Sequence, residues 1–262
     1  MFFYLLLFII GACVGSFLNV VILRLPQKKS IVKESSHCPN CQKKLKAYDL
    51  IPVISFFLLG AKCRNCQKKI SWQYPIVELV CAGLFIFLGY HYQILTNFAN
   101  PIFYRDLVFV STLLIIFVTD LKYYLIFDAV TVPLMIFAFL INFFILSNSN
   151  NYWSVFINLI VSAVIGGGFF LLQYIVSKGK WIGGGDIRLG FLMGFMLGWP
   201  MILVALVIAY LVGAIISIFL VIGKKKKMKS EVPFGVFLSF ATFVVLIWGN
   251  QILNWYLTQL GI

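Results

Sequence analysis

Long runs of apolar residues alternate with short polar segments along most of the chain. A helix needs about 20 mostly apolar residues to cross a bilayer. Eight such runs, the sixth of them short, lie at residues 2–23, 75–95, 106–120, 129–147, 154–177, 187–199, 200–222 and 233–256. Backbone groups in hydrocarbon must pair internally, and unbroken runs favour helices over the alternating segments of a barrel. The pattern therefore predicts an all-α polytopic membrane protein with about eight transmembrane helices.

Composition gives the same result. Apolar residues make up 62% of the 262 positions and charged residues 11%, whereas soluble domains carry about 45–50% apolar and about 25% charged residues. A soluble fold of this length could not cover so much apolar surface, so the lipid bilayer is the expected partner. The first run has no basic residue before it, unlike a secretory signal, and we expect residues 1–24 to remain as a first transmembrane helix.

The basic residues indicate an orientation. Lys and Arg are enriched in cytoplasmic loops, and 20 of the 21 in this chain follow odd-numbered spans, with Arg105 as the exception. This distribution predicts a multi-pass protein with both termini outside. The net charge of +13 is then explained by topology and by anionic lipid, and no nucleic acid partner is needed.

One of these basic loops, residues 25–74, is long enough to be a small cytoplasmic domain. Its two Cys-x-x-Cys pairs suit a tetrahedral zinc ion, and four thiolates leave no open position, so the ion would be structural. The predicted ligands are Cys38, Cys41, Cys63 and Cys66. Two disulfides or free thiols are the alternative, which a reducing cytoplasm disfavours. His37 is a possible competing ligand, and no convincing internal repeat stands out.

The acidic residues are few, which makes each one informative. The eight are Glu34, Asp49, Glu78, Asp106, Asp120, Asp128, Asp186 and Glu231. Asp120 ends the third span and Asp186 precedes the sixth, so both lie at the cytoplasmic face. Two carboxyl groups that share a proton can activate water and polarise a peptide carbonyl. Taken alone, each carboxyl would more often be a solvated helix-end residue, and the argument rests on their combination. Asp106 beside Arg105 is expected to be a surface pair.

Three glycines precede Asp186 at Gly183 to Gly185. Glycine allows close backbone approach and conformations that other residues avoid. Glycines at 190, 194 and 198 follow at four-residue spacing, which predicts close helix packing behind Asp186.

These motifs together resemble those of the type IV prepilin peptidases, which are GxGD aspartic membrane proteases. Besides the two acidic segments and the cysteine pairs, the matching segments are Gly15-Ser16-Phe17-Leu18-Asn19-Val20-Val21, Arg24-Leu25-Pro26, Tyr74-Pro75-Ile76-Val77-Glu78 and Pro233-Phe234-Gly235. Phe127 stands where the family usually has Pro, and Arg188 where it usually has Lys. Neither change removes a catalytic carboxylate.

The resemblance implies cleavage of the basic leader of prepilins or pseudopilins at the cytoplasmic face of a bacterial inner membrane. It also implies methylation of the new N-terminus from S-adenosylmethionine. Asp120 and Asp186 would be the catalytic pair, and Asp128, Gly183 and Gly185 would support it. The implied division is residues 1–24 as the first helix, residues 25–74 as the zinc loop with a part in methylation, and residues 75–262 as the protease core.

Glu78 is the remaining acid near a cytoplasmic helix end. It could bind the new α-amino group or the cofactor, or it could pair with a loop Lys or Arg. Two further alternatives remain open at this point. The chain could be a leader peptidase without methyltransferase activity, or a non-proteolytic transporter or scaffold whose membrane acids bind protons.

Overall fold

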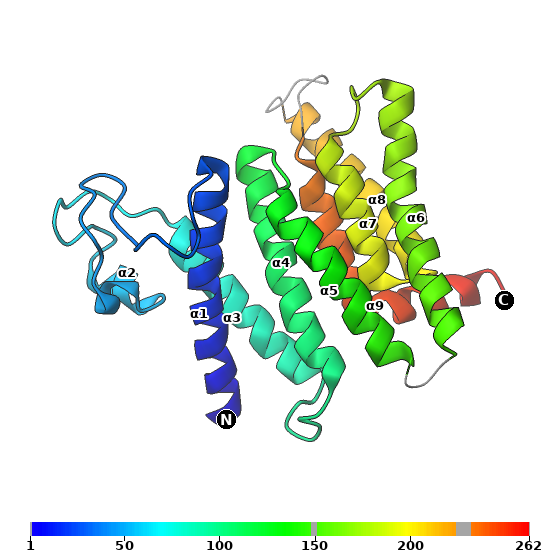
Figure 1. The fold of residues 1–262 in the computed structure, drawn as a ribbon, viewed down its shortest axis with the longest axis horizontal. Helices are drawn as coiled ribbons and strands as arrows, with labels where there is room; N and C mark the ends of the chain where they lie inside the picture. Colours follow the sequence, from blue (N-terminus) through cyan, green and yellow to red (C-terminus); the bar gives the residue numbers. More distant parts are fainter. Residues whose placement is uncertain (1, 148–150, 224–231, 262) are drawn as a thin grey trace. The chain divides into compact units, whose positions relative to one another are not determined.

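The structure is a computed structural model that describes residues 2–147, 151–223 and 232–261. Its nine α-helices in this part of the chain are α1 Phe2–Arg24, α2 Ile54–Leu58, α3 Gln73–His91, α4 Pro101–Tyr123, α5 Asp128–Ser147, α6 Tyr152–Ser177, α7 Gly184–Leu197, α8 Met201–Ile222 and α9 Phe234–Gln259 (Figure 1). Short 3-10 turns lie at Leu25–Gln27 and Ala47–Leu50. The all-α prediction is confirmed. The basic run 224–229 and Glu231 lie outside the described residues.

Seven of these helices are long and apolar enough to cross a membrane: α1, α3, α4, α5, α6, α8 and α9. The remaining predicted span, residues 187–199, corresponds to α7, which has only 14 residues. At 1.5 Å per residue, α7 is about 21 Å long, shorter than the hydrocarbon core of about 30 Å. The protein is therefore a multi-pass membrane protein with seven full-length candidate spans and one short helix.

The chain divides into two compact units, residues 1–111 and 112–262. In the first unit, α1 packs along α3 and the polar loop between them carries α2. In the second unit, α7 packs against α5, α6 and α9, and α8 packs against α9. The short helix α7 is thus surrounded by longer ones, which positions the residues at its start.

Helices α6 and α7 approach so closely that their backbones touch. A methyl group added at Gly190 would lie 2.5 Å from the carbonyl oxygen of Gly166, and one at Gly194 would lie 2.4 Å from Cα of Ala163. Because the later residue on α7 faces the earlier residue on α6, the two helices run antiparallel. The predicted close packing of this glycine row is confirmed at Gly190 and Gly194.

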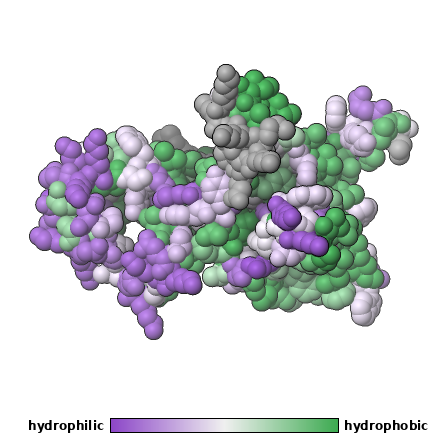
Figure 2. Space-filling model, turned by 90° about the horizontal axis from the view of Figure 1, so that it is seen from above, coloured by the Kyte–Doolittle hydropathy of each residue, from purple (hydrophilic) through white to green (hydrophobic). Residues whose placement is uncertain are grey.

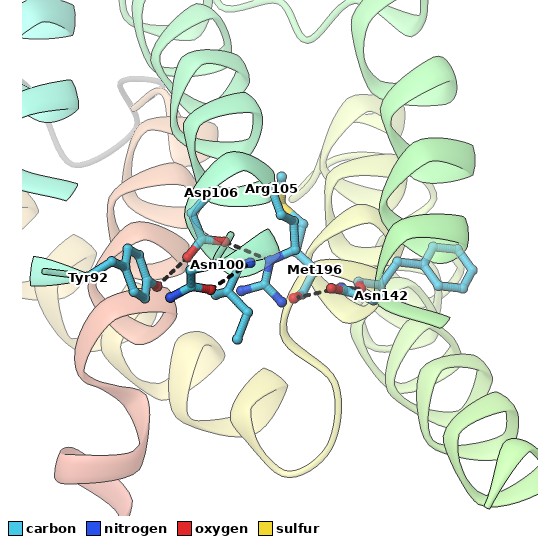
Figure 3. A network of polar contacts seen from close by, with 8 residues as sticks. Tyr92, Asn100, Arg105, Asp106, Asn142 and Met196 are labelled. Atoms are coloured by element: carbon cyan, nitrogen blue, oxygen red, sulfur yellow. Dashed lines mark hydrogen bonds and ion pairs between the residues drawn. The ribbon is translucent and has the colours of Figure 1, made fainter. Parts of the chain in front are cut away.

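The end of α7 is capped by side chains from neighbouring helices. Asn142 of α5 is 2% exposed and donates to the carbonyl oxygens of Phe195 and Met196 at 2.6 and 3.2 Å (Figure 3). Asn158 of α6 accepts from the Trp199 amide at 3.0 Å and donates to its carbonyl oxygen at 3.2 Å. Helix-end carbonyls need such partners where water is excluded, so α7 can end inside the bundle.

Candidate active site and metal site

Asp120 lies near the end of α4 and is 5% exposed. Its carboxylate accepts a hydrogen bond from the amide of Val236 at 3.1 Å, and the amide of Gly235 also donates to it. Gly235 and Val236 lie in the first turn of α9, where amides have no partner within the helix. The N-cap residue, Pro233, supplies no side-chain cap. Asp120 therefore caps α9 from another helix.

Asp186 lies in the first turn of α7. Its carboxylate accepts from the amide of Gly183 at 3.2 Å, and its own amide donates to the Gly183 carbonyl at 3.1 Å. This reciprocal bonding fixes the side chain at the helix N-terminus, where negative charge is favoured. Asp186 is only partly buried, so it remains open to a ligand.

Ile126 joins the surroundings of the two acids. A methyl group added at Gly185 would lie 2.9 Å from Cβ of Ile126. One added at Gly235 would lie 2.9 Å from the Asp120 carboxylate and 3.0 Å from Cδ1 of Ile126. The backbones next to Asp120 and Asp186 thus contact the same side chain.

The glycines before Asp186 are not equivalent. Gly185 has no room for a side chain, as its contact with Ile126 shows. Gly183 has an extended backbone with φ −80°, and its nearest neighbour for an added methyl group is the Asp186 carboxylate at 3.7 Å. The close contact with Ile126 explains why residue 185 is a glycine. Gly183 instead contributes its backbone amide, which donates to Asp186.

Asp128 is the first residue of α5 and forms an ion pair with Arg188 of α7. Both side chains are largely exposed, at 57% and 42%. An exposed ion pair contributes little to stability, but this one links the starts of the two helices, two residues beyond Asp186.

The four loop cysteines form one cluster. Their sulfur atoms all lie within 4.8 Å of one another, and Sγ of Cys38 lies 3.8 Å from Sγ of Cys66. A tetrahedral zinc ion with bonds of about 2.3 Å places its sulfurs about 3.8 Å apart. All four thiols are free, and amides of Cys66 and Asn65 lower the pKa of the Cys63 thiol to about 6. The cluster fits zinc, and His37 instead contacts the Ser35 carbonyl oxygen at 3.1 Å.

The two halves of this cluster have the same local structure, so the expectation of no internal repeat was wrong. The Cys38 and Cys63 amides donate to the carbonyls of Lys43 and Lys68 at 3.0 and 2.9 Å. Each half also closes with a Gln at φ 57°. The sequence signal is the pair Cys-Pro-Asn-Cys-Gln-Lys-Lys-Leu and Cys-Arg-Asn-Cys-Gln-Lys-Lys-Ile. It is short, and the two copies begin 25 positions apart, at Cys38 and Cys63.

Glu78 contacts the backbone of the same loop. It is 6% exposed and accepts from the Val53 amide at 2.7 Å and from Ser16. Val53 has φ 63° and ψ −55°, and the Ile54 amide donates to the Pro52 carbonyl across it at 2.6 Å. This is a strained three-residue turn, unusual for a β-branched residue. One alternative for Glu78 was an ion pair with a loop Lys or Arg. The ion pairs of the described residues do not include Glu78.

The predicted pair of Asp106 with Arg105 is confirmed, but its predicted place at the surface was wrong, because Asp106 is buried. Asp106 is 0% exposed; it accepts from Arg105 at 2.7 Å and from the Tyr92 hydroxyl at 2.5 Å (Figure 3). Burial, reinforced by the Asp106 charge, raises the pKa of Tyr92, so the phenol stays a donor. The network ties the end of α3 to the start of α4, and sequence reasoning missed the role of Tyr92.

Comparison with known proteins agrees with this picture. Residues 9–92 match the N-terminal domain of bacterial A24 peptidases, and residues 107–218 match the type IV leader peptidase family. The chain is 30% identical to a prepilin leader peptidase/N-methyltransferase of Bacillus subtilis, over 96% of this chain and 97% of the relative. Proteins of the same description from Legionella pneumophila and Pseudomonas aeruginosa are 28% and 29% identical, over 98% and 97% of this chain and 95% and 93% of those proteins. No solved structure shows a significant match.

Proposed function

Because the chain belongs to the type IV leader peptidase family, we propose that it cleaves the leader from prepilins or pseudopilins and methylates the new N-terminus. The peptidase activity rests on one observation above all. Asp120 and Asp186, 66 residues apart in sequence, lie in one compact unit, where the glycines beside them, Gly235 and Gly185, both contact Ile126. Such a pair of carboxyl groups is what aspartic proteolysis requires.

In the proposed reaction, one carboxylate takes a proton from water while the other, protonated, donates a hydrogen bond to the scissile carbonyl. The water oxygen adds to the carbonyl carbon. The C–N bond then breaks, with one proton delivered to the leaving amine. Asp120 is fixed by the amides of α9 and Asp186 by the amide of Gly183, so both carboxyl groups are oriented before substrate binds. Asp128, through Arg188, supports the start of α7.

The four cysteines would hold a zinc ion in a closed, structural site, and the loop of residues 25–74 would take part in methylation. S-adenosylmethionine, when bound, supplies the methyl group to the free amine. Glu78 is already bonded to Val53, and we assign it to positioning of the loop. The remaining core, residues 75–262, carries the peptidase chemistry.

We place the protein in the bacterial inner membrane with both termini outside and the two acids at the cytoplasmic face. Arg188 and Lys122 lie within two residues of Asp186 and Asp120, and basic residues flank spans on the cytoplasmic side. A basic leader would therefore be cut on the side where it remains after synthesis.

The test is co-expression with a prepilin, comparing wild type with Asp120→Asn and Asp186→Asn. Each change removes a proton-transfer group, so leader removal should fall by about 100-fold or more, as measured by the shift in substrate mass. Glu34→Gln, at an exposed acid of the loop, is the matched control. Cleavage that persists in either Asp variant contradicts the peptidase proposal. Transfer of a labelled methyl group from S-adenosylmethionine to cleaved substrate separately tests the second activity.

A further inference from the structure

The loop between α1 and α3 carries an apolar face that points away from its own core. Helix α2 places Ile54, Phe57 and Leu58 at i, i+3 and i+4, on one side of the helix. Their exposed fractions are 57%, 59% and 81%. Phe56, on the other side, is 4% exposed and packs on the ring of Trp72 at 4.9 Å.

Trp72 extends this face. It is 59% exposed, its ring centroid lies 6.3 Å from that of Phe57, and it directly precedes α3. We call Ile54, Phe57, Leu58 and Trp72 the α2 face. In a small polar domain surrounded only by water, such side chains are expected to turn inward. A contiguous exposed apolar patch of this kind instead marks an interaction site.

A hydrogen bond fixes the depth of the α2 face along α3. Val53, the residue before α2, donates its amide to Glu78, the sixth residue of α3. Five residues of helical rise place Glu78 about 8 Å from the start of α3. The 19 residues of α3 are only just enough to cross a bilayer, so its start lies near the membrane boundary. The bond therefore holds α2 on the bilayer side of that boundary. Figure 1 shows α2 at the level of the body of α1.

The charge of the loop suits the same location. Residues 25–72 contain ten Lys and Arg but only two acidic residues. Hydrophilic side chains gather over the loop in Figure 2, with apolar atoms between them. Amphipathic segments of this kind insert their apolar side chains at the headgroup boundary while basic residues attract anionic lipid, and Trp favours that boundary.

We propose that the α2 face is a lipid-contact surface, inserted in the leaflet on the side of the membrane where α3 begins. The zinc loop is then a monotopic attachment lying on the bilayer beside α1 and α3. Glu78 is the positioning residue that sets its depth by holding the strained turn at Val53.

The test uses the full chain in nanodiscs of phosphatidylethanolamine and phosphatidylglycerol. An azide-bearing residue replaces Leu58 in one variant and Val32 in another, and each is coupled to an environment-sensitive dye. Val32 is the matched control because it lies in the same loop and is 89% exposed. At position 58, a shallow nitroxide lipid should quench the dye and iodide should quench it several-fold less than at position 32.

Equal quenching by iodide at both positions overturns the proposal. A dye at 58 that is shielded only after a purified prepilin is added also overturns it, and shows that the face binds substrate instead. A second pair of variants tests the depth argument. Glu78→Gln keeps an acceptor for the Val53 amide and should preserve lipid quenching, whereas Glu78→Leu should lose it while zinc content stays constant. Unchanged quenching in Glu78→Leu contradicts the role of Glu78.

Discussion

At the scale of single residues, the candidate site depends on backbone amides that meet side chains from distant parts of the chain. Asp120 was predicted from its place at the end of a span, but its hydrogen-bond partner Val236 lies 116 residues later. The segment Pro233-Phe234-Gly235 was noted in the sequence only as a family motif, with no physical explanation. The structure supplies the role, because Gly235 leaves room for the Asp120 carboxylate beside the first turn of α9.

We predict that Gly235→Ala disables peptide cleavage without unfolding the protein. The added methyl group would lie 2.9 Å from the Asp120 carboxylate and 3.0 Å from Ile126, so the carboxyl group must move. A displacement of about 1 Å in a catalytic group can lower the rate by about 100-fold. Cleavage of a purified prepilin measures the rate. Gly168→Ala is the control, since an added methyl group there meets nothing within 4 Å; equal rates for the two variants would refute the prediction.

At the scale of elements, apolar run length predicted the helices well, because lipid leaves helix as the simplest way to satisfy the backbone. Run length also predicted a short sixth helix at residues 187–199, close to the observed α7 of 14 residues. It could not predict the caps from Asn142 and Asn158, because these side chains come from other helices. Cysteine spacing predicted the metal cluster because a Cys-x-x-Cys turn brings two sulfurs together locally. The fold of α2 and the bond from Val53 to Glu78 were not predictable, because they depend on tertiary contact.

We expect removal of zinc to unfold the loop and leave the membrane helices intact. A segment this small builds little core of its own, so its stability comes largely from the metal. Cys63→Ser should abolish stoichiometric zinc, make residues 25–72 sensitive to protease, and reduce methyl transfer more than leader cleavage. Metal analysis and limited proteolysis provide the measurements. Cys13→Ser, at an exposed thiol outside the cluster, should behave as wild type; equal zinc loss in both variants would argue against the site.

At the scale of the whole molecule, the orientation depends on whether α7 crosses the membrane. The basic residues predict both termini outside, which requires an even number of crossings. Seven helices of the described residues are long enough to span, so the eight crossings that the sequence predicts would include α7. Its antiparallel packing against α6 and the capped turn that leads into α8 support a crossing despite its length of about 21 Å.

A reporter fused to the C-terminus of the full chain should therefore be outside the cytoplasm. We predict high alkaline phosphatase activity and no fluorescence when phosphatase and green fluorescent protein are fused there. A fusion after Ser177, at the end of α6, should give the reverse pattern because it precedes α7. Fluorescence from the full-length C-terminal fusion would place the C-terminus in the cytoplasm, and the predicted orientation would be wrong.

The paired cysteine turns also affect how α2 is presented. They stand at the two ends of the 21-residue stretch between Cys41 and Cys63, and α2 lies within it. An ion shared by both turns closes this stretch into a ring and removes much of its freedom before it meets any other surface. Zinc binding and membrane attachment of the loop are then coupled. In a cell short of zinc, the loop would both unfold and attach less firmly to the membrane.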